Sequence, residues 1–163
     1  MRLALLLTVT IACSTNGKRE DSAPMPPPAK ITDAAPYAGA RVFLATPSGE
    51  VEVKVEVVAT EAKIQKGLMF RAHLPTDAGM LFLMGVERVH SFWMRNTLIP
   101  LDMLFIGKDM TVVGIVENAE PLTESLRTVG KPSFYVLEVN GGWSKQHGVT
   151  AGAKARFENV SQN

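Results

Sequence analysis

Alternating apolar and polar residues mark the first two strands of the chain. Segment 51–57 reads VEVKVEV, a period of two that predicts a strand with one buried face. Segment 41–46 is a second apolar-rich run, and the residues between the two, Pro47 to Glu50, have the composition of a turn. The two segments are therefore predicted to form a hairpin.

The apolar pattern predicts further short elements as far as the C-terminus. A helix is expected from Thr60, a capping residue, to Arg71, and a helical turn at 143–147. The remaining strands are predicted at 80–83, 91–94, 101–106, 111–116, 134–139 and 153–160. About eight short strands with one or two short helices indicate a β-rich α+β domain, a compact rolled sheet or open barrel over residues 39–163.

The N-terminus has a different pattern. Arg2 precedes an apolar run over residues 3–12, which is shorter than the roughly 20 residues that a membrane-spanning helix needs. The pattern predicts a signal peptide at 1–12. Cys13 directly follows and resembles the lipidated cysteine of a bacterial lipobox, so cleavage before it would leave a lipid anchor there. Residues 13–38 are polar and Pro-rich, which predicts a disordered tether.

These features predict an exported, membrane-anchored lipoprotein of the bacterial envelope, facing the periplasm in a Gram-negative cell. Ser14, which follows the cysteine, resembles the pattern of lipoproteins sent to the outer membrane. The expected partners are the membrane, through the anchor, and an envelope glycan or another envelope protein.

Composition narrows the function further. Apolar residues make up 46% and charged residues 20%, and the formal net charge is +1 with scattered Lys and Arg. This argues against nucleic-acid binding, which needs a basic face. Cys13 is the only cysteine, so the domain has no disulfide and no thiolate metal site of its own. We expect no cofactor and no metal.

Four spaced motifs resemble one known family. They are KGLMFR at 66–71, GMLF at 79–82, FWMRNTLIPLD at 92–102, and VLE at 136–138 followed by Gly141. Their combination and order are similar to the family called domain of unknown function 192, with the likeness running from about Val51 to Val160. The resemblance implies a small β-rich domain, often secreted or lipid-anchored, and no established activity.

Several polar side chains fall among apolar residues, where they cost free energy unless they are paired. With one aromatic neighbour they form the candidate site: Arg71, Trp93, Arg95, Asn96, Asp102 and Glu138. One interpretation is structural: Asp102 pairs with an arginine or caps the corner between Asn96 and Pro100, which Asn96 helps to fix, and Glu138 pairs with another arginine. The other is a polar pocket beside Phe92 and Trp93 that suits a sugar or a small anion.

Two further functions compete with a binding module. Asp102 and Glu138 could act as acid and base on an envelope glycan. Alternatively, soft methionine and histidine ligands could hold Cu(I); these are Met69, Met80, Met84, Met94, Met103, His73 and His90. No nucleophile motif is present, so the sequence favours a non-catalytic binding or accessory module, without catalytic residues.

Overall fold

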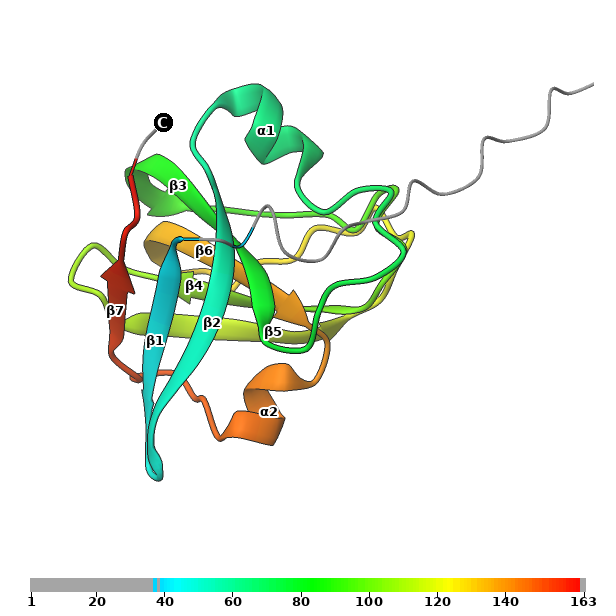
Figure 1. The fold of residues 1–163 in the computed structure, drawn as a ribbon. Coiled ribbons are helices and arrows are strands. Elements are labelled where there is room, and N and C mark those ends of the chain that lie inside the picture. Colours follow the sequence, from blue (N-terminus) through cyan, green and yellow to red (C-terminus); the bar gives the residue numbers. More distant parts are fainter. Residues whose placement is uncertain (1–36, 38, 162–163) are drawn as a thin grey trace, which may run out of the picture. The chain divides into compact units, whose positions relative to one another are not determined.

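The computed structural model describes residue 37 and residues 39–161, which form one curled seven-stranded sheet (Figure 1). The strands are β1 (Arg41–Thr46), β2 (Gly49–Val58), β3 (Ala78–Val89), β4 (Leu101–Ile106), β5 (Val112–Ala119), β6 (Pro132–Asn140) and β7 (Ala155–Glu158). The two short helices are α1 (Glu61–Lys66) and α2 (Trp143–His147). This arrangement confirms the predicted β-rich rolled sheet.

The strands lie in the order β5-β4-β6-β3-β2-β1-β7, and each neighbouring pair except β2 and β3 is antiparallel. The two edge strands approach each other at one end, where Thr111 forms an isolated bridge with Lys154. The Ala155 N–H also donates to the Met110 carbonyl at 2.7 Å. These contacts curl the sheet into an open barrel.

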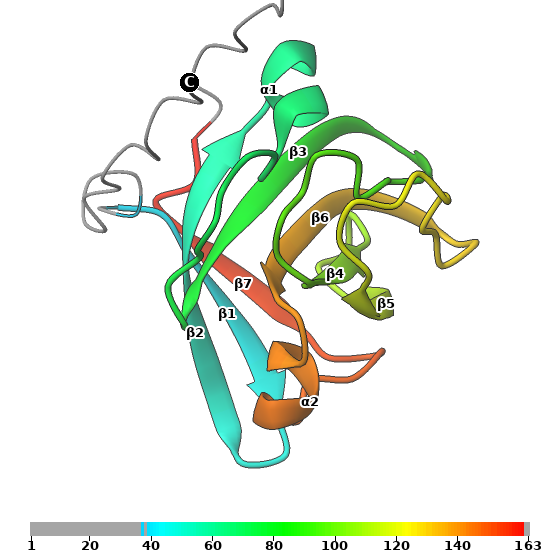
Figure 2. The ribbon, with the colours of Figure 1, turned by 90° about the vertical axis from the view of Figure 1, so that its right-hand side faces the viewer.

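Both faces of the central strands are covered, so β4 is buried at every position. One apolar cluster contains Leu81, Leu104, Leu137 and Trp143 of α2. A second contains alternate residues of the same strands, such as Phe82 and Phe105. Helices α1 and α2 lie at opposite ends of the sheet (Figure 2).

Three predicted elements differ most from the structure. Segment 91–94 is not a strand, because only Phe92 pairs there, in an isolated bridge with Arg127. Strand β3 runs from Ala78 to Val89, far beyond the predicted 80–83, with a register shift between Leu83 and Arg88. Helix α1 is shorter than predicted and ends at Gly67, whose φ of 47° leaves the helical region.

The predicted signal peptide, the lipid-attachment residue Cys13 and nearly all of the predicted tether lie outside the described residues. Within the described part of the chain, no helix is long and apolar enough to cross a membrane.

Candidate functional site

Glu138 is the most unusual titratable residue of the sheet. It lies on β6, where its Cα pairs with that of Met80 on β3 and that of Met103 on β4. Because side chains alternate between the faces of a sheet, Glu138 shares a face with these two buried methionines. Only 4% of Glu138 is exposed.

No residue among 37 and 39–161 forms a side-chain hydrogen bond or an ion pair with the Glu138 carboxyl that would offset its burial. Burial disfavours the charged form and raises the pKa of Glu138 to about 8. Near neutral pH the carboxyl is therefore mostly protonated, and it can donate a hydrogen bond or lose its proton to the surroundings.

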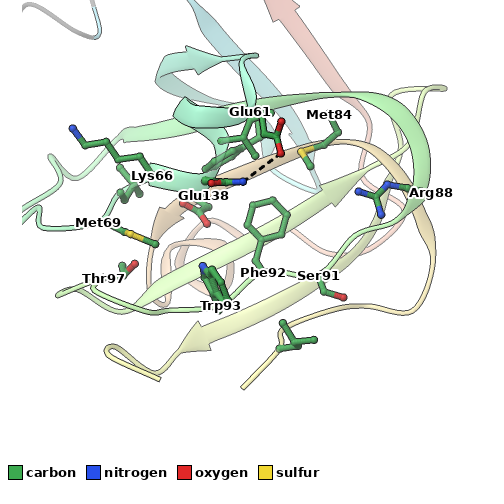
Figure 3. A pocket seen from close by; sticks show the side chains of 16 residues that line it. Glu61, Lys66, Met69, Met84, Arg88, Ser91, Phe92, Trp93, Thr97 and Glu138 are labelled. Atoms are coloured by element: carbon green, nitrogen blue, oxygen red, sulfur yellow. Dashed lines mark hydrogen bonds between the residues drawn. The ribbon is translucent and has the colours of Figure 1, made fainter. Parts of the chain in front are cut away.

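A pocket of about 350 Å³ opens beside Glu138 (Figure 3). It lies between helix α1 on one side and segment 91–97 on the other, with part of β3 along its wall. Its apolar lining includes Phe82, Phe92 and Trp93, while Lys66 and Arg88 bring exposed charges to it. Glu138, Phe92 and Trp93 all line this pocket (Figure 3). The arrangement is a concave, largely apolar pocket with two buried polar residues in its lining, Thr97 and Glu138. Such a combination is typical of small-molecule sites.

Segment 91–97 is held in place by backbone hydrogen bonds to two other loops. The Phe70 N–H donates to the Asn96 carbonyl at 2.8 Å, and the Met94 N–H donates to the Thr123 carbonyl at 2.9 Å. Asn96 adopts a φ of 56°, a left-handed conformation that asparagine tolerates better than most residues. Asn96 therefore shapes the corner through its backbone.

Asp102 lies on the opposite face of the sheet from Glu138, since its Cα pairs with that of Val139. It is completely buried. Its Oδ1 accepts hydrogen bonds from the N–H groups of Asn118 (2.7 Å) and Gly142 (2.8 Å), and its Oδ2 accepts one from that of Ser144 (2.8 Å). Asp102 thus binds the first turn of α2 to the end of β5, and this set of bonds accounts for its burial.

The two arginines of the candidate cluster lie apart from the pocket lining. Arg71 pairs with Glu56 (Nη2 to Oε2, 2.5 Å) and donates to the Tyr37 hydroxyl at 3.2 Å. Arg95 is exposed, lies 3.8 Å from Glu124 and has its guanidinium 5.7 Å from the centre of the Trp93 ring. Of the six candidate residues, only Trp93 and Glu138 therefore meet in the pocket, and neither arginine pairs with Asp102 or Glu138.

The residues proposed for copper are divided between the core and the pocket. Met80, Met94 and Met103 belong to the apolar core, whereas Met69 and Met84 line the pocket. His90 is buried, with its Nε2 3.1 Å from the Val86 carbonyl oxygen. Among residues 37 and 39–161 there is no group of three or more His, Cys, Asp or Glu that could hold a metal ion.

Sequence reasoning missed the part of the pocket contributed by α1 and β3. Glu61, Lys66, Met84 and Arg88 all line it, yet they come from elements that the apolar pattern does not place beside segment 91–97. The sequence contains one signal for this arrangement. Ile64 and Leu68 form an apolar helical face, and such a face is expected to pack against some part of the sheet.

The fold and the pocket define a small β-rich domain with a pocket over one face of a curled sheet. Its sequence matches the model of the DUF192 family, described as uncharacterized ACR, over residues 43–157. The match covers more than half of the chain, and the chain belongs to this family.

Two crystal structures are similar to the chain. One is of a "putative transcription regulator" from Sinorhizobium meliloti 1021, with 40% identity and a TM-score of 0.72 over 78% of this chain and 99% of that one. The other is a protein of unknown function from Novosphingobium aromaticivorans DSM 12444, with 40% identity and a TM-score of 0.69 over 71% of this chain and 83% of that one. No curated protein matches the chain.

Proposed function

We propose that this protein is a lipid-anchored binding module of the bacterial cell envelope, which binds a small molecule in the Glu138 pocket and catalyses no reaction. The observation that carries the binding role is the buried carboxyl of Glu138 in a pocket of about 350 Å³. The Glu138 oxygens are not among the fully buried side-chain atoms that lack a partner, so the carboxyl opens onto the pocket. Burial still disfavours its charged form, and an apolar residue would serve the fold better. A ligand that forms hydrogen bonds with Glu138 would explain why a carboxyl occupies this position.

The absence of catalysis is supported by the separation of the two carboxylates. The glycan-hydrolysis hypothesis requires Asp102 and Glu138 to flank one bond of a substrate. They lie on opposite faces of the sheet, and the backbone donors around Asp102 occupy both of its oxygens.

Trp93, at 43% exposed, suits the binding of a ligand that enters from solvent.

The envelope location is supported by the sequence of the N-terminus: the apolar run over residues 3–12, the cysteine at position 13 and the Pro-rich segment after it. The length of such a segment would allow the domain to reach away from the membrane surface while the anchor retains it. A lipid anchor of several acyl chains would hold the protein stably, whereas one chain binds only weakly.

The two parts of the proposal have separate tests. For the anchor, we would express the full chain and a Cys13→Ala variant in a bacterial host with a labelled fatty acid. The parent should carry the label and fractionate with the membrane, and the variant should do neither. A parent without the label would refute the anchor.

For the binding role, we would titrate the purified chain with a small-molecule panel and follow the Trp93 indole N–H by NMR. A ligand at 100 times its dissociation constant adds about 2.7 kcal/mol to the free energy of unfolding, which a thermal melt detects. Binding that is saturable and lost in Trp93→Ala would support the pocket. Saturable binding unaffected by both Trp93→Ala and Glu138→Gln would refute it.

A further inference from the structure

The charged residues that line the pocket differ in how deeply they are buried. Glu138 is buried, whereas Glu61, Lys66 and Arg88, which also line the pocket, are exposed at its rim. The Lys66 and Arg88 side chains form no ion pair with Glu138 within 4 Å. A ligand that fills the pocket therefore meets a carboxyl at its base, while solvent screens the charges at the rim.

This distribution disfavours the anionic ligand that the sequence suggested. That expectation depended on Arg71 and Arg95, and the structure pairs them with Glu56 and Glu124 instead. An anion in the pocket would have to approach the Glu138 carboxyl without either arginine. Once Glu138 is ionised, the two negative charges would repel each other strongly, because charges interact more strongly where the dielectric constant is low.

The aromatic lining of the pocket favours a cation. Phe82, Phe92 and Trp93 all line the pocket, and the Phe82 and Phe92 rings meet edge to face, with 5.3 Å between their centroids. Aromatic ring faces attract cations, and indole does so most strongly. The Trp93 ring already attracts one cation, since the Arg95 guanidinium lies 5.7 Å from its centroid.

We infer that the pocket's ligand is a small organic cation, with a protonated amine or an alkylated ammonium group that pairs with the Glu138 carboxylate and packs against Phe92 and Trp93. This inference rests on the proposed binding function and specifies its ligand class. The cation supplies the charge partner that Glu138 lacks, and the aromatic rings provide a surface that favours a weakly hydrated ammonium group.

Binding of such a cation is coupled to proton release. Burial raises the pKa of Glu138 to about 8, so the empty pocket holds mostly the protonated acid at neutral pH. The other charged groups that face the pocket are Glu61 and Lys66 from α1 and Arg88 from β3. A permanent cation binds only the ionised carboxyl, so its affinity should rise about tenfold per pH unit from pH 6 toward 8.

The test compares cations with neutral molecules of similar shape. Choline is paired with 3,3-dimethylbutan-1-ol, and glucosamine with glucose, each titrated calorimetrically into the full chain in detergent micelles at pH 6, 7 and 8. The same titrations in buffers of different ionisation enthalpy count the protons released. We expect the cations to bind and to release close to one proton per molecule at pH 7, while the neutral partners bind much more weakly.

Two variants identify the group responsible. Glu138→Gln removes the buried charge with little change of shape and should weaken cation binding by at least about 30-fold. Glu117→Gln is the control, because it neutralises an exposed carboxylate on β5 that does not line the pocket, and it should leave the affinity within about threefold of the parent. Urea unfolding of both variants verifies that they are folded.

The possible failures are distinguishable. Neutral molecules that bind as tightly as their charged partners, with shifts at Trp93, would overturn the cation inference and leave the binding function in place. Cation binding that survives in Glu138→Gln would overturn it as well. If neither class binds and the Trp93 indole signal does not move, both the inference and the proposed binding function are refuted.

Discussion

Asp102 and Glu138 lie on adjacent strands of one sheet and point to opposite faces of it. The Cα of Asp102 pairs with that of Val139, and the Cα of Glu138 pairs with that of Met103. Three backbone N–H groups donate to Asp102, whereas Glu138 faces a pocket without a partner among the described residues. Two buried carboxylates that look alike in the sequence therefore have different expected roles, one in stability and one in binding.

Asp102→Asn should lower the free energy of unfolding by about 3 kcal/mol. The amide can keep its oxygen toward Asn118 and Gly142, but its NH2 group then faces the Ser144 N–H, so that two donors meet in a buried site. Urea unfolding followed by circular dichroism measures the loss. Glu117→Gln, an exposed change on β5, is the control and should stay within about 0.5 kcal/mol of the parent. Equal stability of Asp102→Asn and the parent would contradict the structural role.

Glu138 should make the protein less stable as the pH rises. Its pKa is raised from 4.5 to about 8 in the folded state, so between these values the folded protein holds a proton that the unfolded chain has released. The stabilising contribution of the protonated acid is complete below about pH 4.5 and is lost as the pH rises toward 8. The expected decline is about 1.4 kcal/mol per pH unit from this residue.

Glu138→Gln removes this contribution, so the difference in stability between parent and variant should change by that slope between pH 5 and 8. Urea unfolding at four pH values measures it. Glu61→Gln, with its exposed carboxylate, should follow the pH dependence of the parent closely. A constant difference between parent and Glu138→Gln would show that the Glu138 carboxyl has an ordinary pKa.

Phe92 and Trp93 are neighbours with different expected roles. Phe92 contacts Phe82 and Phe105 edge to face, with ring centroids 5.3 and 6.0 Å apart. Phe92→Ala should therefore cost about 2–4 kcal/mol in thermal or urea unfolding. Trp93 is 43% exposed, so Trp93→Ala should cost less than about 1 kcal/mol but abolish ligand binding to the pocket. The opposite ranking of the two stability losses would contradict this assignment.

Gly79 is required by close packing between β3 and β6. A Cβ on this residue would lie 2.5 Å from the carbonyl oxygen of Glu138 and 3.1 Å from Cγ1 of Val139. Gly79→Ala should therefore lower stability by about 1–3 kcal/mol and shift the NMR signals of the pocket, because strand β6 must move. Gly39→Ala is the control, since a Cβ there meets nothing within 4 Å. A Gly79→Ala variant as stable as Gly39→Ala would contradict the packing.

Local patterning determined much of the secondary structure. The alternation in segment 51–57 predicted β2, and segment 101–106 predicted the exact bounds of β4, because apolar periodicity follows directly from burial. Segment 91–94 has the same apolar character but is not a strand. Its backbone groups bond to residues near Thr123 and Arg127, and single-residue patterns carry no information about such distant partners.

The sequence by itself determined the β-rich class, the family resemblance and the presence of two carboxylates in apolar surroundings. Only the tertiary structure decided on which face of the sheet each one lies, because a shift of one residue along a strand reverses the face to which a side chain points. That register, together with the folding of α1 over the sheet, left Arg71, Arg95 and Asp102 outside the pocket and Glu138 within it. The pocket combines residues from five separate stretches of the chain, and their proximity arises from the order of the strands, which no local pattern encodes.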